Sequence, residues 1–241
     1  MSNRRGQARA PGEFGESRHF DLASGQMLRQ LATSADVFLD ADFTPDGKTL
    51  LLAGADHSVV LVDMATAKKS HRLHAHSDAV TAVAVSADGR FFASAGLDRI
   101  AKVFETPTAK LKTTYRDHQN ALYSVGFLPN MEMISAGKDK SAHVWGQSEP
   151  KKKRELAGQG DLLRTLVSGT SVFAGGSAKK IIETTVDKIS VTRSFEGLSD
   201  WIYSIAYHRA THRLAAGCYD GSVAVWDTET GQLNAKFPGI P

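Results

Sequence analysis

The stretch from His118 to Trp145 decides the fold. It reads HQNALYSVGFLPNMEMISAGKDKSAHVW. Three short runs rich in apolar residues, at 122–127, 133–137 and 142–145, are separated by a Pro-Asn turn and by a polar Lys-Asp-Lys turn. Runs of this length, bounded by turn residues, predict three extended strands joined by tight hairpins.

The same pattern recurs along the 241-residue chain, which is decisive because a period of 20 to 50 residues indicates a repeat architecture. The residue that ends the third run lies at Phe20, Val62, Phe104, Trp145, Thr185 and Trp226, at intervals of 42, 42, 41, 40 and 41 residues. The apolar residue that ends the following run lies 10 or 11 residues later in each unit, at Leu31, Leu73, Tyr115, Leu156, Phe195 and Phe237. Each complete unit therefore contains four strands.

The repeat divides the chain into units of unequal quality. The first unit, 17–31, holds only its third and fourth strands, and five full units follow at 32–73, 74–115, 116–156, 157–195 and 196–237. The unit at 157–195 keeps its strand-like runs but loses the turn residues. Residues 1–16 are rich in arginine and glycine and are predicted to form a disordered basic arm, and residues 238–241 are a short tail.

Composition narrows the class of protein. Apolar residues make up 41% of the chain, which is enough for a core, and 29 basic against 26 acidic side chains do not demand nucleic acid or an anionic membrane as a partner. Cys218 is the one cysteine, so an internal disulfide, a thiolate zinc site and a c-type haem are excluded. A reducing, cytoplasmic location is expected. No apolar run approaches the roughly 18 residues of a membrane helix.

Units of about 41 residues with four strands, and Trp226-Asp227 closing a third strand, resemble the WD-repeat β-propellers. The resemblance covers residues 17–237 and implies an all-β chain of four-stranded antiparallel blades: five full repeats plus the third and fourth strands of an incomplete N-terminal blade. Because the last unit already carries its own fourth strand, we expect an open arc or a part of a larger propeller. Open blade edges also allow self-association.

The resemblance further implies a hydrogen-bonded tetrad inside a blade: a His before the first strand, a Ser or Thr on the second, an Asp in the next turn and a Trp on the third. One unit matches all four positions and three match in part: His118, Ser135, Asp139 and Trp145; His76, Ser94 and Asp98, with Phe104 in place of Trp; Asp220 with Trp226; and Asp56 alone in the unit at 32–73. Buried His, Ser and Asp must be paired in any case. Because these types recur at fixed repeat positions, we interpret them as structural rather than as a nucleophilic triad.

Members of the family act mostly through the rim formed by the start of each first strand, so the resemblance points to the residues on either side of that strand's first apolar position. These are Val37 and Leu39, Ala79 and Thr81, Ala121 and Tyr123, Asp161 and Leu163, and Trp201 and Tyr203. Trp201, Tyr203 and Tyr123 are the candidate binding face, because aromatic residues with a polar tip are enriched in binding hot spots. The alternative is that they pack against neighbouring blades.

Two other clusters are interpreted as structural. His71, His74, His76 and Asp78 have spacings that fit no recurrent ligand set, so no metal is predicted. Lys151 to Arg154 lies between a third and a fourth strand, where lysines block edge pairing, and is predicted to be a solvated edge. No phosphate loop or nucleophile elbow occurs, so neither a catalytic residue nor a cofactor is expected.

The leading hypothesis is a non-catalytic scaffold that presents a rigid face to a protein or peptide partner, with no membrane partner. One alternative is a C-terminal accessory or sensor domain of a larger enzyme or redox protein whose catalytic part lies upstream. A third interpretation, a nucleic-acid binder that uses Lys151 to Arg154 and the arginine-rich arm, is the least favoured because the charge elsewhere is close to balance.

Overall fold

The computed structural model describes residues 7–11, 15–21, 23–33, 36–188 and 190–239. The chain divides into two compact units, Met1–Asp117 and His118–Pro241, and each is described by itself. Every regular element in the described ranges is a strand, apart from one three-residue 3-10 turn, η1 (Arg209–Thr211). Within these ranges, no helix has the length and apolar character needed to cross a membrane.

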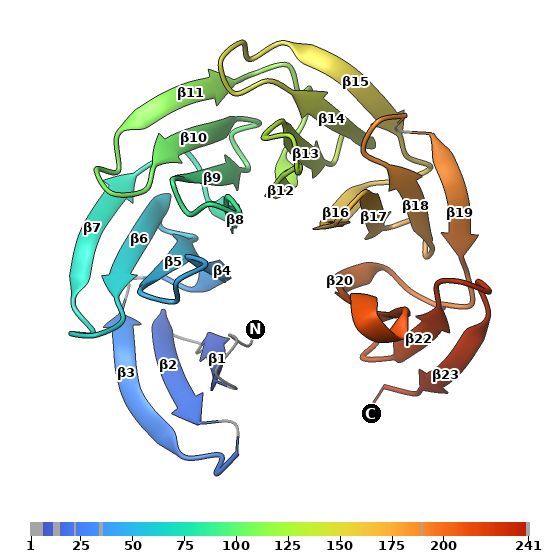
Figure 1. Ribbon diagram of the computed structural model, residues 1–241, viewed down its shortest axis with the longest axis horizontal. Coiled ribbons are helices and arrows are strands. Elements are labelled where there is room, and N and C mark those ends of the chain that lie inside the picture. Colours follow the sequence, from blue (N-terminus) through green and yellow to red (C-terminus); the bar gives the residue numbers. More distant parts are fainter. Residues whose placement is uncertain (1–6, 12–14, 22, 34–35, 189, 240–241) are drawn as a thin grey trace. The chain divides into compact units, whose positions relative to one another are not determined.

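The first unit contains two complete four-stranded antiparallel sheets, each built from strands that follow one another in the chain (Figure 1). The first comprises β4 (Phe38–Phe43), β5 (Thr49–Gly54), β6 (Ser58–Asp63) and β7 (Lys69–His74). The second comprises β8 (Val80–Val85), β9 (Phe91–Gly96), β10 (Ala101–Glu105) and β11 (Leu111–Tyr115).

The second unit contains three more sheets of the same kind. They are β12 (Leu122–Phe127), β13 (Met133–Gly137), β14 (Ser141–Trp145) and β15 (Lys152–Ala157); β16 (Leu162–Ser168), β17 (Ser171–Gly176), β18 (Ile181–Thr185) and β19 (Val191–Phe195); and β20 (Ile202–His208), β21 (Arg213–Cys218), β22 (Val223–Asp227) and β23 (Leu233–Phe237). The prediction of five full four-stranded repeats is thus confirmed, and the unit that lost its turn residues still forms a complete sheet.

The turn between the first two strands of a sheet shows how the sequence sets these hairpins. In the turn after β4, the Thr44 hydroxyl and the Lys48 N–H both donate to Oδ1 of Asp46, over 2.7 and 3.0 Å. Gly47 has a φ of 71°, a left-handed conformation that glycine adopts without a steric penalty. The Pro-Asp-Gly sequence therefore closes the hairpin through one carboxylate and one permissive residue.

The core of each sheet lies in its two middle strands. Every residue of β13 and β14 is buried, whereas β7 alternates between exposed and half-buried residues. In the first unit Leu51, Leu61 and Phe92 belong to one apolar cluster that joins the two complete sheets. Fully buried middle strands read as continuous apolar runs, and half-exposed fourth strands read as alternating ones.

The N-terminal sheet has three strands: β1 (Gln7–Pro11), β2 (Glu16–Asp21) and β3 (Met27–Thr33). β2 and β3 are the two strands predicted for the incomplete first blade. The assignment of residues 1–16 to a disordered arm does not hold for 7–11, which pair with β2 from Gln7 opposite Asp21 to Pro11 opposite Ser17. The physical reason is that β2 would otherwise present a row of unpaired backbone groups. Of the rest of the expected arm, Gly15 and Glu16 are described and Glu16 begins β2, whereas 1–6 and 12–14 lie outside the described residues, as do 240–241 of the tail.

Candidate binding face

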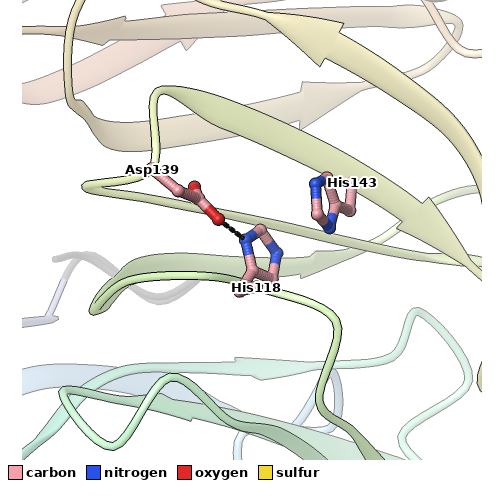
Figure 2. Close-up of side chains that lie close together, drawn as sticks. All are labelled: His118, Asp139 and His143. Carbon is pink, nitrogen blue, oxygen red and sulfur yellow. Dashed lines mark hydrogen bonds and ion pairs between the residues drawn. The ribbon is translucent and has the colours of Figure 1, made fainter.

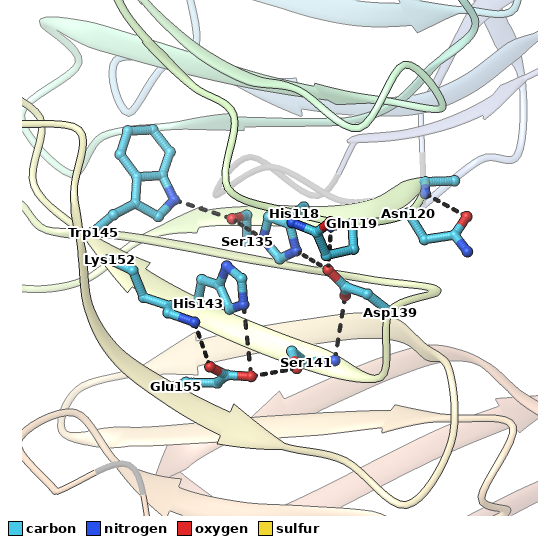
Figure 3. A network of polar contacts seen from close by, with 11 residues as sticks. His118, Gln119, Asn120, Ser135, Asp139, Ser141, His143, Trp145, Lys152 and Glu155 are labelled. Carbon is cyan, nitrogen blue, oxygen red and sulfur yellow. Dashed lines mark hydrogen bonds and ion pairs between the residues drawn. The ribbon is translucent and has the colours of Figure 1, made fainter.

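The complete tetrad lies within the sheet β12–β15 (Figure 3). The imidazole of His118 has its Nδ1 2.7 Å from Oδ2 of Asp139 and its Nε2 2.8 Å from Oγ of Ser135. The indole N–H of Trp145 donates to the same Ser135 Oγ over 3.0 Å. Burial raises the pKa of Asp139, but hydrogen bonds from His118 and from two backbone N–H groups outweigh it, so the pKa is below its ordinary value. The loop before β12 is thereby attached to the β13–β14 turn.

The partial tetrads are attached differently. His76 has its Nδ1 2.9 Å from Asp98 and its Nε2 2.7 Å from Ser94 Oγ, while Phe104, in the Trp position, stacks on Phe92 with ring centroids 4.9 Å apart. In the last sheet Asp220 and Trp226 share no hydrogen-bond partner among the described residues. Asp220 accepts the Ser199 and Ser222 hydroxyls over 2.6 Å each, and the Trp226 indole donates to the Glu196 carbonyl oxygen over 3.0 Å.

The distances in these tetrads match those of a Ser-His-Asp nucleophile system, but their burial does not. Ser135 and Ser94 are 0% exposed, and His118 is 3% exposed. A nucleophilic hydroxyl must also reach a substrate, whereas Ser135 Oγ is enclosed and already accepts the Trp145 N–H. The geometry is that of a buried hydrogen-bond network that holds a loop in place.

His143 was not singled out from the sequence, yet it completes a cluster with His118 and Asp139 (Figure 2). Its ring stacks on that of His118 with centroids 3.9 Å apart and planes 16° apart, and its Nε2 lies 3.8 Å from Oε1 of Glu155. Burial and the neighbouring His118 and Lys152 lower the pKa of His143 to about 4. Strand alternation could have found it, because residues 143 and 145 point to the same face of β14.

This cluster is the one group of three metal-ligand residues found among the described residues. Its geometry does not suit a shared ion. A ligating imidazole nitrogen directs its lone pair in the ring plane, toward a metal about 2.0–2.1 Å away. Two nearly parallel, stacked rings send their lone pairs along separate planes, and both nitrogens of His118 already face Asp139 and Ser135. We interpret the cluster as packing.

The first strand of every complete sheet contains a β-bulge after its first residue. The pairing register shifts between Phe38 and Asp40, and likewise in the other four sheets between Val80 and Ala82, Leu122 and Ser124, Leu162 and Arg164, and Ile202 and Ser204. The extra residue in each sheet is Leu39, Thr81, Tyr123, Leu163 or Tyr203. A bulge re-aims the side chain of its extra residue away from the regular pleat.

In the second unit this bulge places aromatic side chains at the surface. Tyr203 is 61% exposed and Trp201 is 47% exposed, while Tyr123 is half-buried. Burial, together with the nearby charge of Asp161 and the nearby Tyr203, raises the pKa of Tyr123. Tyr123, Trp201 and Tyr203, with the half-buried Asp161, make up what we call the aromatic face.

Tyr219, which the sequence analysis missed, extends the aromatic face. It is 74% exposed, and its ring centroid lies 6.3 Å from that of Tyr203 at an angle of 44°. Its backbone N–H donates to the carbonyl oxygen of Trp201 over 2.9 Å. The available signal was its position: it is an aromatic residue in the turn just after β21, where the chain comes back beside the start of β20.

Comparison with known proteins identifies the repeats. Three segments, 67–105, 109–146 and 189–227, match the family described as WD domain, G-beta repeat. The chain belongs to the WD-repeat β-propeller family. Each matched segment runs from a fourth strand through the third strand of the following sheet, and together they include the tetrads of His76, His118 and Trp226. No curated protein gives a significant match to the chain.

WD-repeat domains generally act as protein-interaction scaffolds. Two other clusters of this chain, the basic run and the histidine cluster, have contacts that account for them structurally. The basic run, expected between a third and a fourth strand, has three of its four residues, Lys152 to Arg154, within the fourth strand β15. Lys152 pairs with Glu155 over 2.6 Å, Lys153 pairs with Glu132 over 2.8 Å, and Arg154 also pairs with Glu132. Side chains held by carboxylates are less able to neutralise phosphates. In the first histidine cluster, His76 is engaged by Asp98 and Ser94, as its tetrad role predicts.

Proposed function

We propose that this WD-repeat chain is a non-catalytic scaffold that binds a protein or peptide partner through the aromatic face. The observation that supports this is the exposure of Trp201, Tyr203 and Tyr219 beside one another on rigid elements. Aromatic side chains carry much of the energy at protein interfaces because they bury a large area at a low entropic cost.

Rigidity is the second support. Tyr203 follows the fully buried Ile202, whose strand pairs with β21, and the Trp201 N–H donates to Oδ1 of Asp200 over 2.8 Å. The aromatic groups are therefore held before any partner arrives, which reduces the entropy lost on binding. A scaffold of this kind acts by complementarity and needs no reacting group.

The test is partner capture with matched variants. The tagged chain and the variants Trp201→Ala and Tyr203→Ala are compared for the proteins they retain from extracts of the source cells, quantified by mass spectrometry. Phe237→Ala is the control, because Phe237 is an exposed aromatic residue, 56% exposed, on the fourth strand of the same sheet. We expect the face variants to lose one or more partners that the control keeps. Equal retention by all three variants would refute the proposal.

A further inference from the structure

A groove in the first unit has features that the aromatic face does not explain. The sheets β4–β7 and β8–β11 are joined along β4 and β8, where the Val83 N–H donates to Oδ2 of Asp40 over 3.1 Å. Where the turns after β4 and β8 meet, a Cβ on Gly89 would lie 3.2 Å from Cδ of Pro45. Beside these turns lies a cavity of about 550 Å³, which we call the inter-sheet groove.

The inter-sheet groove is acidic. Asp46, Asp63 and Asp88 line it, against a single lysine, Lys48. Each carboxylate accepts a hydrogen bond from a nearby Ser or Thr hydroxyl, which holds its pKa below the ordinary value, and for Asp88 lowers it to about 2. All three are therefore ionised at neutral pH. Asp46 lies 3.7 Å from Lys48 Nζ and Asp88 lies 2.6 Å from Arg90 Nε, so among the described residues Asp63 is the groove carboxylate without an ion pair and the one that favours a further cation.

Two polar atoms in the groove lining have no hydrogen-bond partner among the described residues. They are Nδ1 of His71 and Oγ1 of Thr106, both buried at the atom level, and Thr106 as a whole is 9% exposed. A buried polar atom without a partner is costly, and most such atoms in folded proteins are paired. These two atoms come from different sheets, β7 and the end of β10, so one group placed between them could satisfy both.

The fourth strands of the second unit show which side chains occupy the position that His71 holds in β7. By strand register, His71 lies opposite Leu61 just before the bulge in the β6–β7 pair, and Arg154 and Arg193 hold the same place in β15 and β19. Arg154 donates to Glu132 of its own sheet. Of the five such positions in the complete sheets, two thus carry a guanidinium, and the other three carry His71, Thr113 and Ala235.

Arg193 also reaches the counterpart of Thr106. Its guanidinium donates to the carbonyl oxygen of Thr228 in the next sheet, and Thr228 directly follows β22 as Thr106 directly follows β10. The Thr228 hydroxyl donates to the His212 carbonyl oxygen over 3.2 Å, whereas the Thr106 hydroxyl has no such acceptor among the described residues. The chain therefore fills one such position with its own arginine and leaves the other open.

We propose that the inter-sheet groove, lined by Asp63, His71 and Thr106, binds the guanidinium group of an arginine side chain presented by a partner protein. A guanidinium has five N–H donors and no acceptor, so it can donate to a carboxylate, to Thr106 Oγ1 and to Nδ1 of His71 at once. A lysine ammonium is a more strongly hydrated point charge and lacks the planar fork. This site lies within residues 44–107 and is independent of the aromatic face.

The test uses a blocked tripeptide, acetyl-Gly-Arg-Gly-amide, as the probe of the full chain by NMR titration at low salt. The same peptide with citrulline in place of arginine is the neutral control of matched shape, and a lysine peptide tests for charge alone. We expect saturable shifts at the amides of Asp63 and Thr106 with a Kd on the order of millimolar. The citrulline and lysine peptides should bind at least about tenfold more weakly.

Three variants separate binding from folding. His71→Arg should fill the groove from within, as Arg193 does in the second unit, and abolish probe binding while the chain stays folded. His74→Arg is its matched control, because His74 is an exposed residue of the same strand that does not line the groove. Thr106→Val removes the unpartnered hydroxyl and should weaken binding several-fold.

The outcomes decide the proposal. Equal binding of the arginine and citrulline peptides would overturn it, because charge would then play no part. Equal binding of the lysine and arginine peptides would overturn the choice of a guanidinium. No saturable shift up to about tenfold above the millimolar range would show that the groove holds only solvent. Loss of binding in His74→Arg as great as in His71→Arg would place the probe elsewhere.

Discussion

Replacing Ser135 with alanine should destabilise the second unit by more than an ordinary buried Ser-to-Ala change. Because a carboxylate only accepts, Nδ1 of His118 carries the hydrogen toward Asp139. Nε2 of the same ring hydrogen-bonds the Ser135 hydroxyl, whose oxygen in turn accepts the Trp145 indole N–H. The substitution takes the Ser135 hydroxyl away from both Nε2 and the indole N–H, and both atoms lie in fully or nearly fully buried side chains.

The magnitude follows from counting those two groups. Each buried polar group left without a partner costs about 1–3 kcal/mol, so Ser135→Ala should cost about 2–6 kcal/mol. Among the described tetrad contacts, Ser94→Ala removes the hydrogen-bond partner of only one such group, Nε2 of His76, so it should cost about 1–3 kcal/mol. Against a typical total stability of about 5–15 kcal/mol, the first change is a large fraction.

Tryptophan fluorescence during urea unfolding is a suitable assay. All three tryptophans, Trp145, Trp201 and Trp226, lie in the second unit, so their emission reports on the unit that contains Ser135. Circular dichroism follows Ser94→Ala in the first unit. A double-mutant cycle with Trp145→Phe removes the orphaned indole N–H, and the double variant should cost about 1 kcal/mol less than the sum of the single changes.

The reasoning fails if Ser135→Ala lies within about 1 kcal/mol of the unsubstituted chain, since the orphaned groups would then have found other partners. It also fails if Ser135→Ala costs no more than Ser94→Ala. Strict additivity in the cycle with Trp145→Phe would show that the indole and the hydroxyl do not interact energetically.

Three further results are expected. The pKa of His143 in the folded chain, about 4, lies below the ordinary value of 6.5, so the unfolded chain binds the proton at a higher pH than the folded chain does. The contribution of His143 to the free energy of unfolding should therefore be complete above pH 6.5 and be lost as the pH drops toward 4. In His143→Gln the urea midpoint should fall less over that pH range. Gly137→Ala should prevent folding of its sheet, as judged by circular dichroism, because a Cβ there would lie 2.1 Å from the Ala121 carbonyl oxygen, whereas Gly217→Ala, with nothing within 4 Å, should be tolerated. Thr106→Val should raise the thermal midpoint, since it removes a buried hydroxyl without a partner and gains about 1 kcal/mol; a lower midpoint would contradict the assignment of that hydroxyl as unpaired.

The repeat pattern was enough to predict the five complete sheets, because the same order of strands and turns recurs about every 41 residues along the chain. The middle strands are buried on both faces and read as apolar runs, and turn residues such as Asp46 and Gly47 mark the hairpins. The tetrad residues His118, Ser135 and Asp139 were also found from position, because a network that recurs once per unit leaves a recurring residue pattern.

Three features could not be found in this way. β1 is held by its pairing with β2, a long-range backbone effect that leaves no apolar pattern in an arginine- and glycine-rich segment. Tyr219 joins the aromatic face through a turn, and its closeness to Tyr203 depends on sheet geometry rather than on spacing. The inter-sheet groove depends on two strands from different sheets, and the lack of a partner for His71 is visible only once both are placed.

A residue in a sheet usually has to fit the regular pairing register as well as present its side chain to its surroundings. The bulge at the start of each first strand frees one residue from the first of these two requirements. The extra residue lies outside the regular pairing register, and in this chain its identity ranges from Leu39 and Thr81 to Tyr123, Leu163 and Tyr203. Side chains of very different size and polarity are therefore compatible with the same backbone. These five positions form a natural set for a combinatorial library, in which new binding specificities can be selected while the residues that fold the sheets stay unchanged.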